Sequence, residues 1–166
     1  MVCLFNLHIQ TNGGKLVQNY FLHEWKRNLQ AQANGKLSSY VLFKSNFGCE
    51  NYFSVINNIE IRKHFTRLRL SAHSLRIEKG SHQGIPRHNR TCPRCSSNEV
   101  EDELHFFLTC SALHNERESL IQCITDNCIN FIKYANKNKF IWLMNNENKD
   151  ILITLCSYIQ NNERCG

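Results

Sequence analysis

The sequence predicts a mainly α-helical fold: a small helical domain with an embedded Cys-Cys-His-Cys zinc-binding motif. Apolar residues recur at the three- and four-residue spacing of helices along most of the chain, whereas the alternation typical of strands is scarce. Four side chains that can bind a metal follow one another between residues 92 and 110. The 166 residues contain only two prolines and no Ser/Gly-rich linker, which favours one compact unit.

Residues 1–35 are predicted to form a short lead-in followed by a helix over residues 15–32, which Asn34-Gly35 ends. The helix is indicated by apolar side chains at every fourth position: Val17, Phe21, Trp25 and Leu29.

The next region, residues 36–91, is also predicted to be helical. We expect a short helix over residues 37–47, one or two helical turns near residues 52–56, and a longer helix over residues 59–79 that Gly80 ends. Residues 80–91 form a polar connector. In the longer helix, apolar residues spaced four, three, four and three apart define one buried face: Ile61, Phe65, Leu68, Ala72 and Leu75.

Basic side chains are concentrated in residues 61–95, which contain nine Lys and Arg but only one acid, Glu78. This segment therefore carries 9 − 1 = +8, against +6 for the whole chain, as is typical of a protein with a polyanionic partner. On one helix, arginines seven residues apart would form a row that can bind successive phosphates. The predicted nucleic-acid contacts are Arg62, Lys63, Arg67, Arg69, His73, Arg76, Arg87, Arg90 and Arg94.

The cysteine motif has the spacing C-x2-C-x9-H-x4-C. Two cysteines separated by two residues can form a knuckle that presents both sulfurs to one ion, and the later histidine and cysteine complete a closed tetrahedral set. We therefore predict a structural Zn²⁺ bound by Cys92, Cys95, His105 and Cys110. Four nearby residues are alternative ligands: His88, His114, Cys123 and Cys128.

The sequence does not supply a recognisable catalytic site. Its only aspartates are Asp102, Asp126 and Asp150, which are too far apart in sequence to suggest a polymerase or nuclease carboxylate cluster. No H-x-E element precedes the cysteine pair, as zinc deaminases require, and the H-E-x-x-H motif of metalloproteases is missing. A closed four-ligand site also leaves no position for a reactive water. We expect the chain as it stands not to be an enzyme.

The C-terminal region, residues 111–166, is predicted to be helical. Apolar spacing indicates a helix over residues 111–125 and a last helix over residues 146–160. Between them lie a short element of uncertain type, residues 127–134, and an apolar patch, residues 139–145.

The metal motif, with acidic residues just before its histidine, resembles the zinc-binding region of reverse transcriptases from non-LTR (LINE-type) retrotransposons. Residues 36–53 and 66–87 resemble the segment that precedes this finger in related animal elements, so the likeness spans roughly residues 36–160. The family's aromatic residue after the last cysteine is not evident in residues 111–120. The resemblance implies the C-terminal part of an RNA-directed DNA polymerase whose catalytic aspartate pair is missing here.

We therefore expect a zinc-stabilised module that binds RNA or DNA through phosphate contacts, together with the rest of a retroelement polyprotein or its ribonucleoprotein. The alternatives are a zinc-stabilised protein–protein interaction module and a non-functional fragment of a decayed element. No run of apolar residues is long enough to span a membrane, and the first residues do not resemble a secretory signal. An intracellular location, nuclear or cytoplasmic, is expected.

Overall fold

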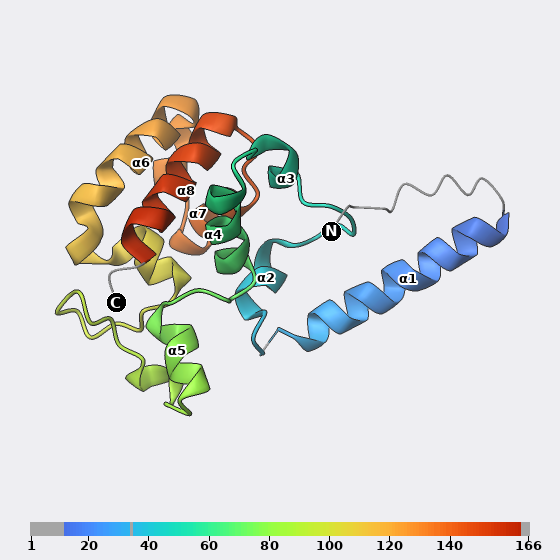
Figure 1. Cartoon of the computed structure of the whole chain (residues 1–166), viewed down its shortest axis with the longest axis horizontal. Coiled ribbons are helices and arrows are strands. Elements are labelled where there is room, and N and C mark those ends of the chain that lie inside the picture. Colours follow the sequence, from blue (N-terminus) through green and yellow to red (C-terminus); the bar gives the residue numbers. More distant parts are fainter. Residues whose placement is uncertain (1–11, 34, 164–166) are drawn as a thin grey trace.

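The structure is a computed structural model that describes residues 12–33 and 35–163, and its regular elements are helices, as the sequence predicts (Figure 1). The only β pairing within these residues is an isolated antiparallel bridge between Thr91 and Val100. Three parts of the sequence-based predictions lie outside the described residues: the lead-in before residue 12, the Asn34 of the first helix stop, and residues 164–166.

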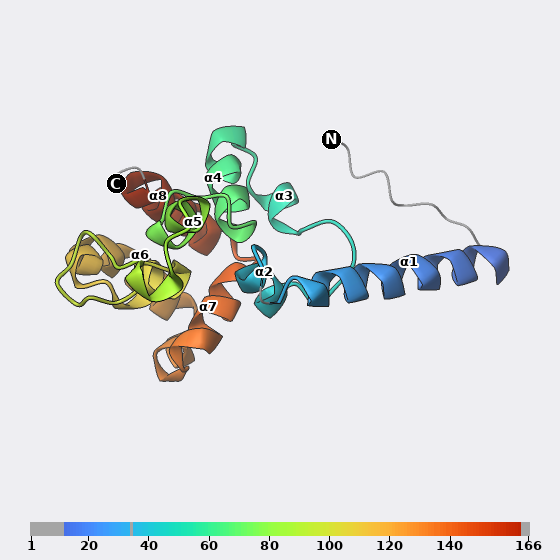
Figure 2. The same cartoon turned by 90° about the horizontal axis from the view of Figure 1, so that it is seen from below.

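The first half of the chain contains one long helix and several short ones. The long helix α1 (Asn12–Ala31) extends away from the rest of the molecule, as Figures 1 and 2 show. The shorter helices are α2 (Ser38–Phe43), α3 (Tyr52–Val55), α4 (Ile59–Arg69), α5 (Arg76–His82) and the 3₁₀ turn η1 (Arg87–Asn89).

The second half begins with two short turns beside the predicted metal ligands, η2 (His105–Thr109) and η3 (Ser111–Leu113). The predicted helix over residues 111–125 starts later, as α6 (His114–Asn127). Residues 127–134, for which the sequence left the type of element open, contain a 3₁₀ turn, and the apolar patch of residues 139–145 belongs to a helix. The remaining elements are η4 (Ile129–Lys133), α7 (Asn136–Met144) and α8 (Lys149–Glu163).

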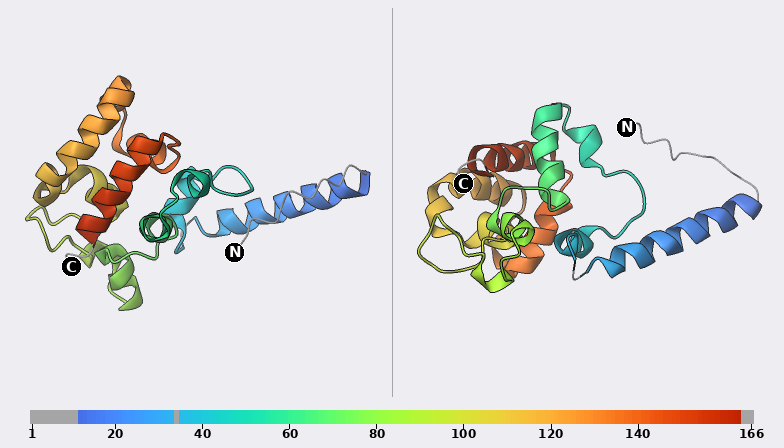
Figure 3. Two further views of the ribbon diagram at one scale, coloured as in Figure 1. Left: turned by 45° about the horizontal axis from the view of Figure 1, so that its top comes forward. Right: turned by 60° about the horizontal axis from the view of Figure 1, so that its bottom comes forward.

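Helix α8 is the centre of the packing. It lies against both α4 and α6 (Figure 3), and its Leu152, Leu155 and Ile159 are completely buried. The same hydrophobic core includes Phe43 of α2 and Cys110, which is one of the predicted metal ligands. Residues on both sides of the cysteine motif therefore pack around one core, in which the motif takes part.

The single helix predicted over residues 59–79 is wrong, because the chain forms two helices separated by residues 70–75. At the break Ser71 has a positive φ of 49°, which an α-helix cannot accommodate. The chain turns there because Ser74 is held by α8: its backbone N–H donates to Glu163 Oε1 at 3.0 Å, and its hydroxyl donates to the Glu163 carbonyl at 2.6 Å. Arg62, Arg69 and Arg76 consequently do not form one helical row.

Gly80, predicted to end that helix, instead lies within α5. A Cβ at this position would come within 2.7 Å of Arg90 Cγ, so the glycine allows the stem of Arg90 to cross the helix. The Arg90 guanidinium then donates to the carbonyl oxygens of Ile77 and Ile85, both at 2.8 Å. This glycine thus serves close packing and does not terminate the helix.

The apolar face predicted for α1 is covered only near its C-terminal end. Leu29 is buried, and Trp25 packs edge-on against Phe47 with 5.6 Å between the ring centroids. Val17 and Phe21, which belong to the same predicted face, are exposed. None of the helices in the described ranges is long and apolar enough to cross a membrane.

Candidate metal centre

A tight turn presents the first pair of predicted ligands, Cys92 and Cys95. The turn is closed by the Cys92 N–H, which donates to the Glu99 carbonyl at 2.9 Å, and by the Glu101 N–H, which donates to the Arg90 carbonyl at 3.0 Å. The chain reverses with the help of a left-handed residue, Asn98, at φ 58°. This is the knuckle geometry that the C-x2-C spacing predicts.

The second pair, His105 and Cys110, flanks the single wide turn η2. Asp102 starts this turn, because its Oδ1 accepts a hydrogen bond from the His105 N–H at 3.0 Å. The turn ends where the Cys110 N–H donates to the His105 carbonyl at 2.8 Å. Arg117 of α6 stabilises the end of this turn by donating to the Cys110 carbonyl at 2.6 Å and to the Leu108 carbonyl at 3.2 Å.

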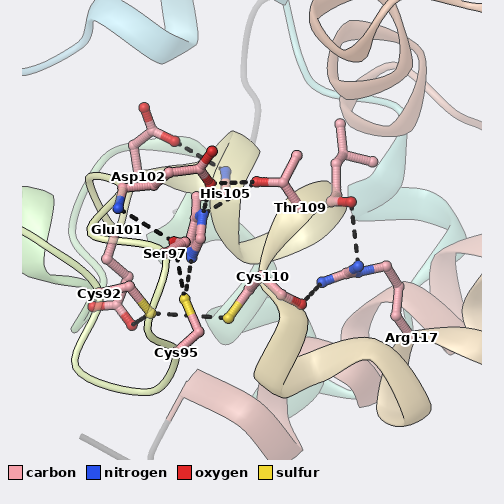
Figure 4. Close-up of polar contacts among 11 residues, drawn as sticks. Cys92, Cys95, Ser97, Glu101, Asp102, His105, Thr109, Cys110 and Arg117 are labelled. Carbon is pink, nitrogen blue, oxygen red and sulfur yellow. Dashed lines mark hydrogen bonds and ion pairs between the residues drawn. The ribbon is translucent and has the colours of Figure 1, made fainter.

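The four ligand atoms converge, as Figure 4 shows, and lie within 4.8 Å of one another. The sulfurs of Cys92 and Cys110 are 3.8 Å apart, and the Cys95 sulfur is 3.4 Å from His105 Nε2. Metal bonds of about 2.3 Å to sulfur and about 2.0 Å to nitrogen place tetrahedral ligands about 3.8 Å apart for S–S and about 3.5 Å apart for S–N. The cluster therefore has the size of a tetrahedral metal site.

The histidine is oriented by groups beyond the four ligands. Its Nε2 faces the sulfurs, while its Nδ1 lies 2.7 Å from Glu99 Oε2 and 3.1 Å from the Thr109 hydroxyl. Thr109 also donates to Glu99 at 3.2 Å, so that it fixes the carboxylate. A carboxylate on the far nitrogen of a metal-ligating histidine sets its tautomer and orientation.

The three cysteines have different electrostatic surroundings. Burial raises the pKa of Cys92 to about 12 and also raises that of Cys110. A hydrogen bond from the Ser97 hydroxyl, with an Sγ–Oγ distance of 3.2 Å, contributes most to lowering the pKa of Cys95 to about 6. Buried thiols become thiolates when a metal cation balances their charge, so these surroundings fit a site that could bind a metal ion.

One arginine partly neutralises the negative charge that three cysteine thiolates would bring to such a site. The side chain of Arg94 is only 11% exposed, and its Nε lies 3.2 Å from Glu101 Oε1. The same oxygen is 3.9 Å from the Cys92 sulfur. Arg94 also donates to the carbonyl of Asn162 in α8 at 2.5 Å, which ties the knuckle to the core.

The alternative ligands do not join this cluster. His88 and His114 are exposed side chains of η1 and α6. Cys123 lies farther along α6, where it accepts a hydrogen bond from Thr154 at 3.6 Å, and Cys128 follows the end of that helix. Within the described residues, the only candidate metal-binding group is the one formed by the four predicted ligands.

The predicted nucleic-acid contacts differ in how far they are exposed, and three of them have structural roles inside the protein. Arg69 is 2% exposed and His73 is 5% exposed, so neither can bind a phosphate; Arg94 is occupied as described above. Arg62 and Arg90 are partly exposed, but their guanidinium groups donate to backbone carbonyls. The predicted contacts whose side chains are exposed are Lys63, Arg67 and Arg87, and Arg76 is partly exposed. Of these, Arg67 also donates from Nε to the Ala72 carbonyl at 2.9 Å, and Arg87 pairs with Asp102 at 3.1 Å.

Arg69 is buried because aromatic rings and a carboxylate surround it. Its guanidinium carbon lies 4.4 Å from the Phe43 ring centroid and 5.2 Å from that of Tyr52. It pairs with Glu50 at 2.8 Å and also donates to the Met144 carbonyl. Burial lowers the pKa of Arg69, and the Glu50 carboxylate opposes that shift. This set of contacts joins α4 to the loop before α3 and to the end of α7.

His73 is buried for a comparable reason. Its Nε2 lies 3.1 Å from Glu103 Oε1. Burial is the largest effect on the pKa of Glu103 and acts to raise it, but the hydrogen bond and electrostatic interaction with His73, together with smaller hydrogen-bond contributions, lower it overall. The acidic residues after the knuckle are therefore used internally: Glu101 pairs with Arg94, Asp102 with Arg87 at 3.1 Å, and Glu103 with His73.

Sequence reasoning did not assign roles to Glu99, Asp102 and Thr109. Two of them belong to the acidic run before His105, and that run was the available signal: an acid six residues before a histidine reaches its ring across the turn.

Comparison of the chain with protein-family models, curated proteins and solved structures finds no match.

Proposed function

We propose that the Cys92–Cys95–His105–Cys110 cluster binds one structural Zn²⁺ ion. Three thiolates and one imidazole are the donor set that Zn²⁺ prefers, and the ligand separations fit its tetrahedral geometry. The four protein ligands close the coordination sphere, so the ion would hold the knuckle to α6 and to the core and would not activate water.

Metal analysis of the purified protein tests this proposal. We expect about one equivalent of zinc after dialysis, lost in Cys92→Ser and in His105→Ala. Cys123→Ser, which changes a cysteine outside the cluster, is the matched control and should keep the metal. Retention of a full equivalent by both ligand variants would show that other residues bind it.

We also propose that the zinc-stabilised domain binds RNA or DNA, as the C-terminal region of a LINE-type reverse transcriptase would. The observation that carries the proposal is the +8 segment immediately before the metal centre, part of which stays at the surface. Lys63 and Arg67 are exposed on α4, Arg87 is exposed on η1, and Arg76 of α5 is partly exposed. These four residues are the proposed phosphate contacts. No polymerase or nuclease step is part of this function.

Binding to a labelled duplex over a range of salt concentrations tests this function. Phosphate contacts release counterions, so log K should fall with log salt by ~0.9 per phosphate contacted. We expect Lys63→Glu/Arg67→Glu to weaken binding and flatten the slope. Lys137→Glu, an exposed change on α7, is the control and should bind almost normally. No binding at low salt would refute the proposal and leave the protein–protein module.

Arg69 has to be kept out of this test. Reversing its charge would remove a buried structural side chain, so loss of binding would report unfolding. Variants of exposed residues avoid this ambiguity. Circular dichroism of each variant confirms that the fold is retained before binding is compared.

A further inference from the structure

A cavity of about 640 Å³ opens at the surface between the end of η4, helix α7 and the turn that leads into α8. Two of its lining residues are aromatic: Tyr134, which follows η4, and Trp142 of α7. Both rings pack against the buried Phe131, whose ring centroid lies 6.4 Å from that of Tyr134 and 5.1 Å from that of Trp142. Tyr134 is exposed and Trp142 partly exposed, so both rings are held in place and remain accessible. We call this cavity the Tyr134–Trp142 slot.

Amide side chains stand beside the aromatic residues of the slot. Asn138, Ile141, Trp142 and Asn145 follow one another at intervals of three, one and three residues, which places them on one face of α7 and its end. Within the described residues, the side chains of Asn138 and Asn145 make no hydrogen bond, and both residues are exposed. Their amide donors and acceptors are therefore available to a ligand.

The rim formed by the turn before α8 is already ordered. Asn148 Oδ1 accepts from the N–H groups of Asp150 at 2.9 Å and Ile151 at 3.3 Å, and its Nδ2 donates to Asn127 Oδ1 at 3.0 Å. Asn146 Oδ1 accepts from the Asn148 N–H at 2.9 Å. A slot with fixed walls and a volume of several hundred Å³ is typical of ligand sites, which are usually largely preformed.

Basic charge surrounds the slot. Residues 128–149 contain four lysines and one acid, or 4 − 1 = +3. Lys133, Lys137 and Lys149 are exposed, each is the sequence neighbour of a lining residue, and none of the three pairs with an acid among the described residues. The acid, Glu147, accepts a hydrogen bond from the Asn51 amide. The balance of charge favours an anionic ligand.

Aromatic rings, free amides and lysines together match an unpaired nucleotide. Bases of single strands stack on aromatic side chains and form hydrogen bonds through their Watson–Crick edges, while their phosphates attract basic residues. Inside a duplex, both the base faces and these edges are occupied. We propose that the Tyr134–Trp142 slot binds an unpaired base of single-stranded RNA or DNA. The inference rests on the proposed nucleic-acid binding and names the form of nucleic acid that a second surface takes.

This second surface is separate from the proposed phosphate contacts on α4. Figure 2 shows α7 projecting from the side of the molecule opposite to α4. Variants of the slot and variants of α4 therefore test different contacts, and a duplex, which cannot enter the slot, reports on α4 without it.

Tryptophan fluorescence tests the stacking directly. The chain has two tryptophans, so Trp25→Phe leaves Trp142 as the reporter. We expect a short single-stranded oligonucleotide to quench its emission, because a base stacked on an indole quenches it. The same sequence in a duplex should quench far less, and a mononucleotide should require a much higher concentration, because it lacks the neighbouring phosphates. No quenching by the single strand at low salt, or equal quenching by either competitor, would overturn the proposal.

Two substitutions of exposed residues test the slot by affinity. Tyr134→Leu removes the ring but stays apolar and should weaken single-strand binding roughly tenfold. Asn138→Asp places a carboxylate in the slot and should also weaken it. The matched controls are Tyr20→Leu and Asn28→Asp at exposed positions of α1, which should bind the single strand as the wild type does. Unchanged single-strand affinity in both slot variants would refute the slot.

The slot and the α4 contacts fail in different ways. Duplex binding that is weakened in Lys63→Glu/Arg67→Glu but kept in Tyr134→Leu would support two separate surfaces. A chain that binds the single strand through the slot but binds no duplex would refute the α4 contacts and support the slot. A chain that binds the duplex but no single strand would refute the slot alone.

Discussion

Arg69 was predicted to contact nucleic acid, but in the structure it is buried and has a structural role. Its guanidinium is enclosed by Phe43 and Tyr52 and pairs with Glu50, whose other oxygen accepts a hydrogen bond from Tyr40 at 2.8 Å. Burial, followed by the hydrogen bond to Glu50, raises the pKa of Tyr40 well above its ordinary value, so this phenol stays neutral. Lys44 also pairs with Glu50 at 3.0 Å, so Arg69 and Lys44 together neutralise this mostly enclosed carboxylate, with Arg69 approaching it from within the core.

We predict that Arg69→Ala lowers the free energy of unfolding by about 2–4 kcal/mol, because it leaves a cavity among the aromatic rings and removes a buried partner of Glu50, although Lys44 remains beside that carboxylate. Lys63→Ala, in the exposed part of the same helix, should change it by less than about 0.5 kcal/mol. Urea denaturation of the two variants measures the difference. Equal stabilities would contradict the structural role of Arg69.

Glu99 provides a second prediction at the scale of single residues. Its carboxylate orients His105 without touching the metal position, so Glu99→Ala should leave the fold intact and weaken metal affinity about 10–100-fold. Competition with a chromophoric chelator measures this affinity. Glu116→Ala, an exposed acid on α6, is the control. Unchanged affinity in Glu99→Ala would show that the histidine is held by Thr109 and the backbone alone.

At the scale of elements, the break between α4 and α5 is the main departure from the sequence-based prediction. Apolar spacing continues from Ile61 to Leu75 without a glycine or proline, so nothing local predicts the break. Its cause lies far away in the chain: Glu163 binds Ser74, and the Glu101 carboxylate accepts from the Arg76 N–H at 2.8 Å. Contacts of this range cannot be derived from periodicity.

The break stores strain at Ser71, a buried non-glycine residue with φ 49°. We predict that Ser71→Gly raises the free energy of unfolding by about 0.5 kcal/mol, since glycine adopts this conformation without a Cβ clash. Ser71→Val should lower it by about 2 kcal/mol, because a branched side chain is poorly accommodated there. Thermal unfolding of both variants measures these effects.

Asn98 is the matched control for this test. Its φ of 58° is also left-handed, but asparagine tolerates that region, so Asn98→Gly should change the stability little. A stabilisation of Asn98→Gly equal to that of Ser71→Gly would show that the effect is not caused by strain specific to Ser71, because the greater flexibility of glycine by itself destabilises a fold.

At the scale of the whole molecule, the candidate metal cluster was predictable from the sequence, whereas the exposure of the basic residues was not. The four ligands follow from local spacing, because a knuckle and the next turn are built within 19 residues, 92–110. Whether an arginine is exposed depends on partners distant in sequence: Arg69 meets Met144, and Arg94 meets Asn162. A +8 segment therefore predicted a charged surface more extensive than the one that forms.

The metal centre and the core also share side chains, which leads to the last prediction. Cys92 and Cys110 belong to the hydrophobic core, and between the ligands lie Phe106 and Phe107, both completely buried. The Phe106 carbonyl accepts a hydrogen bond from the Tyr158 hydroxyl of α8 at 2.8 Å, so displacement of η2 would disturb the central helix. Loss of the ion should thus affect the whole domain and not the knuckle alone.

We predict that removal of the metal with a chelator abolishes the near-UV circular dichroism of the domain and the cooperativity of its thermal unfolding, while part of the helical signal remains. The energetic reason is that a structural zinc site contributes ~10–16 kcal/mol of apparent binding energy, which exceeds the net stability of most domains of this size. Adding back zinc should restore both signals. A chelated protein, verified as metal-free, that unfolds at the original temperature would show that the core is stable without the ion, because its packing would then hold η2 against α8 unaided.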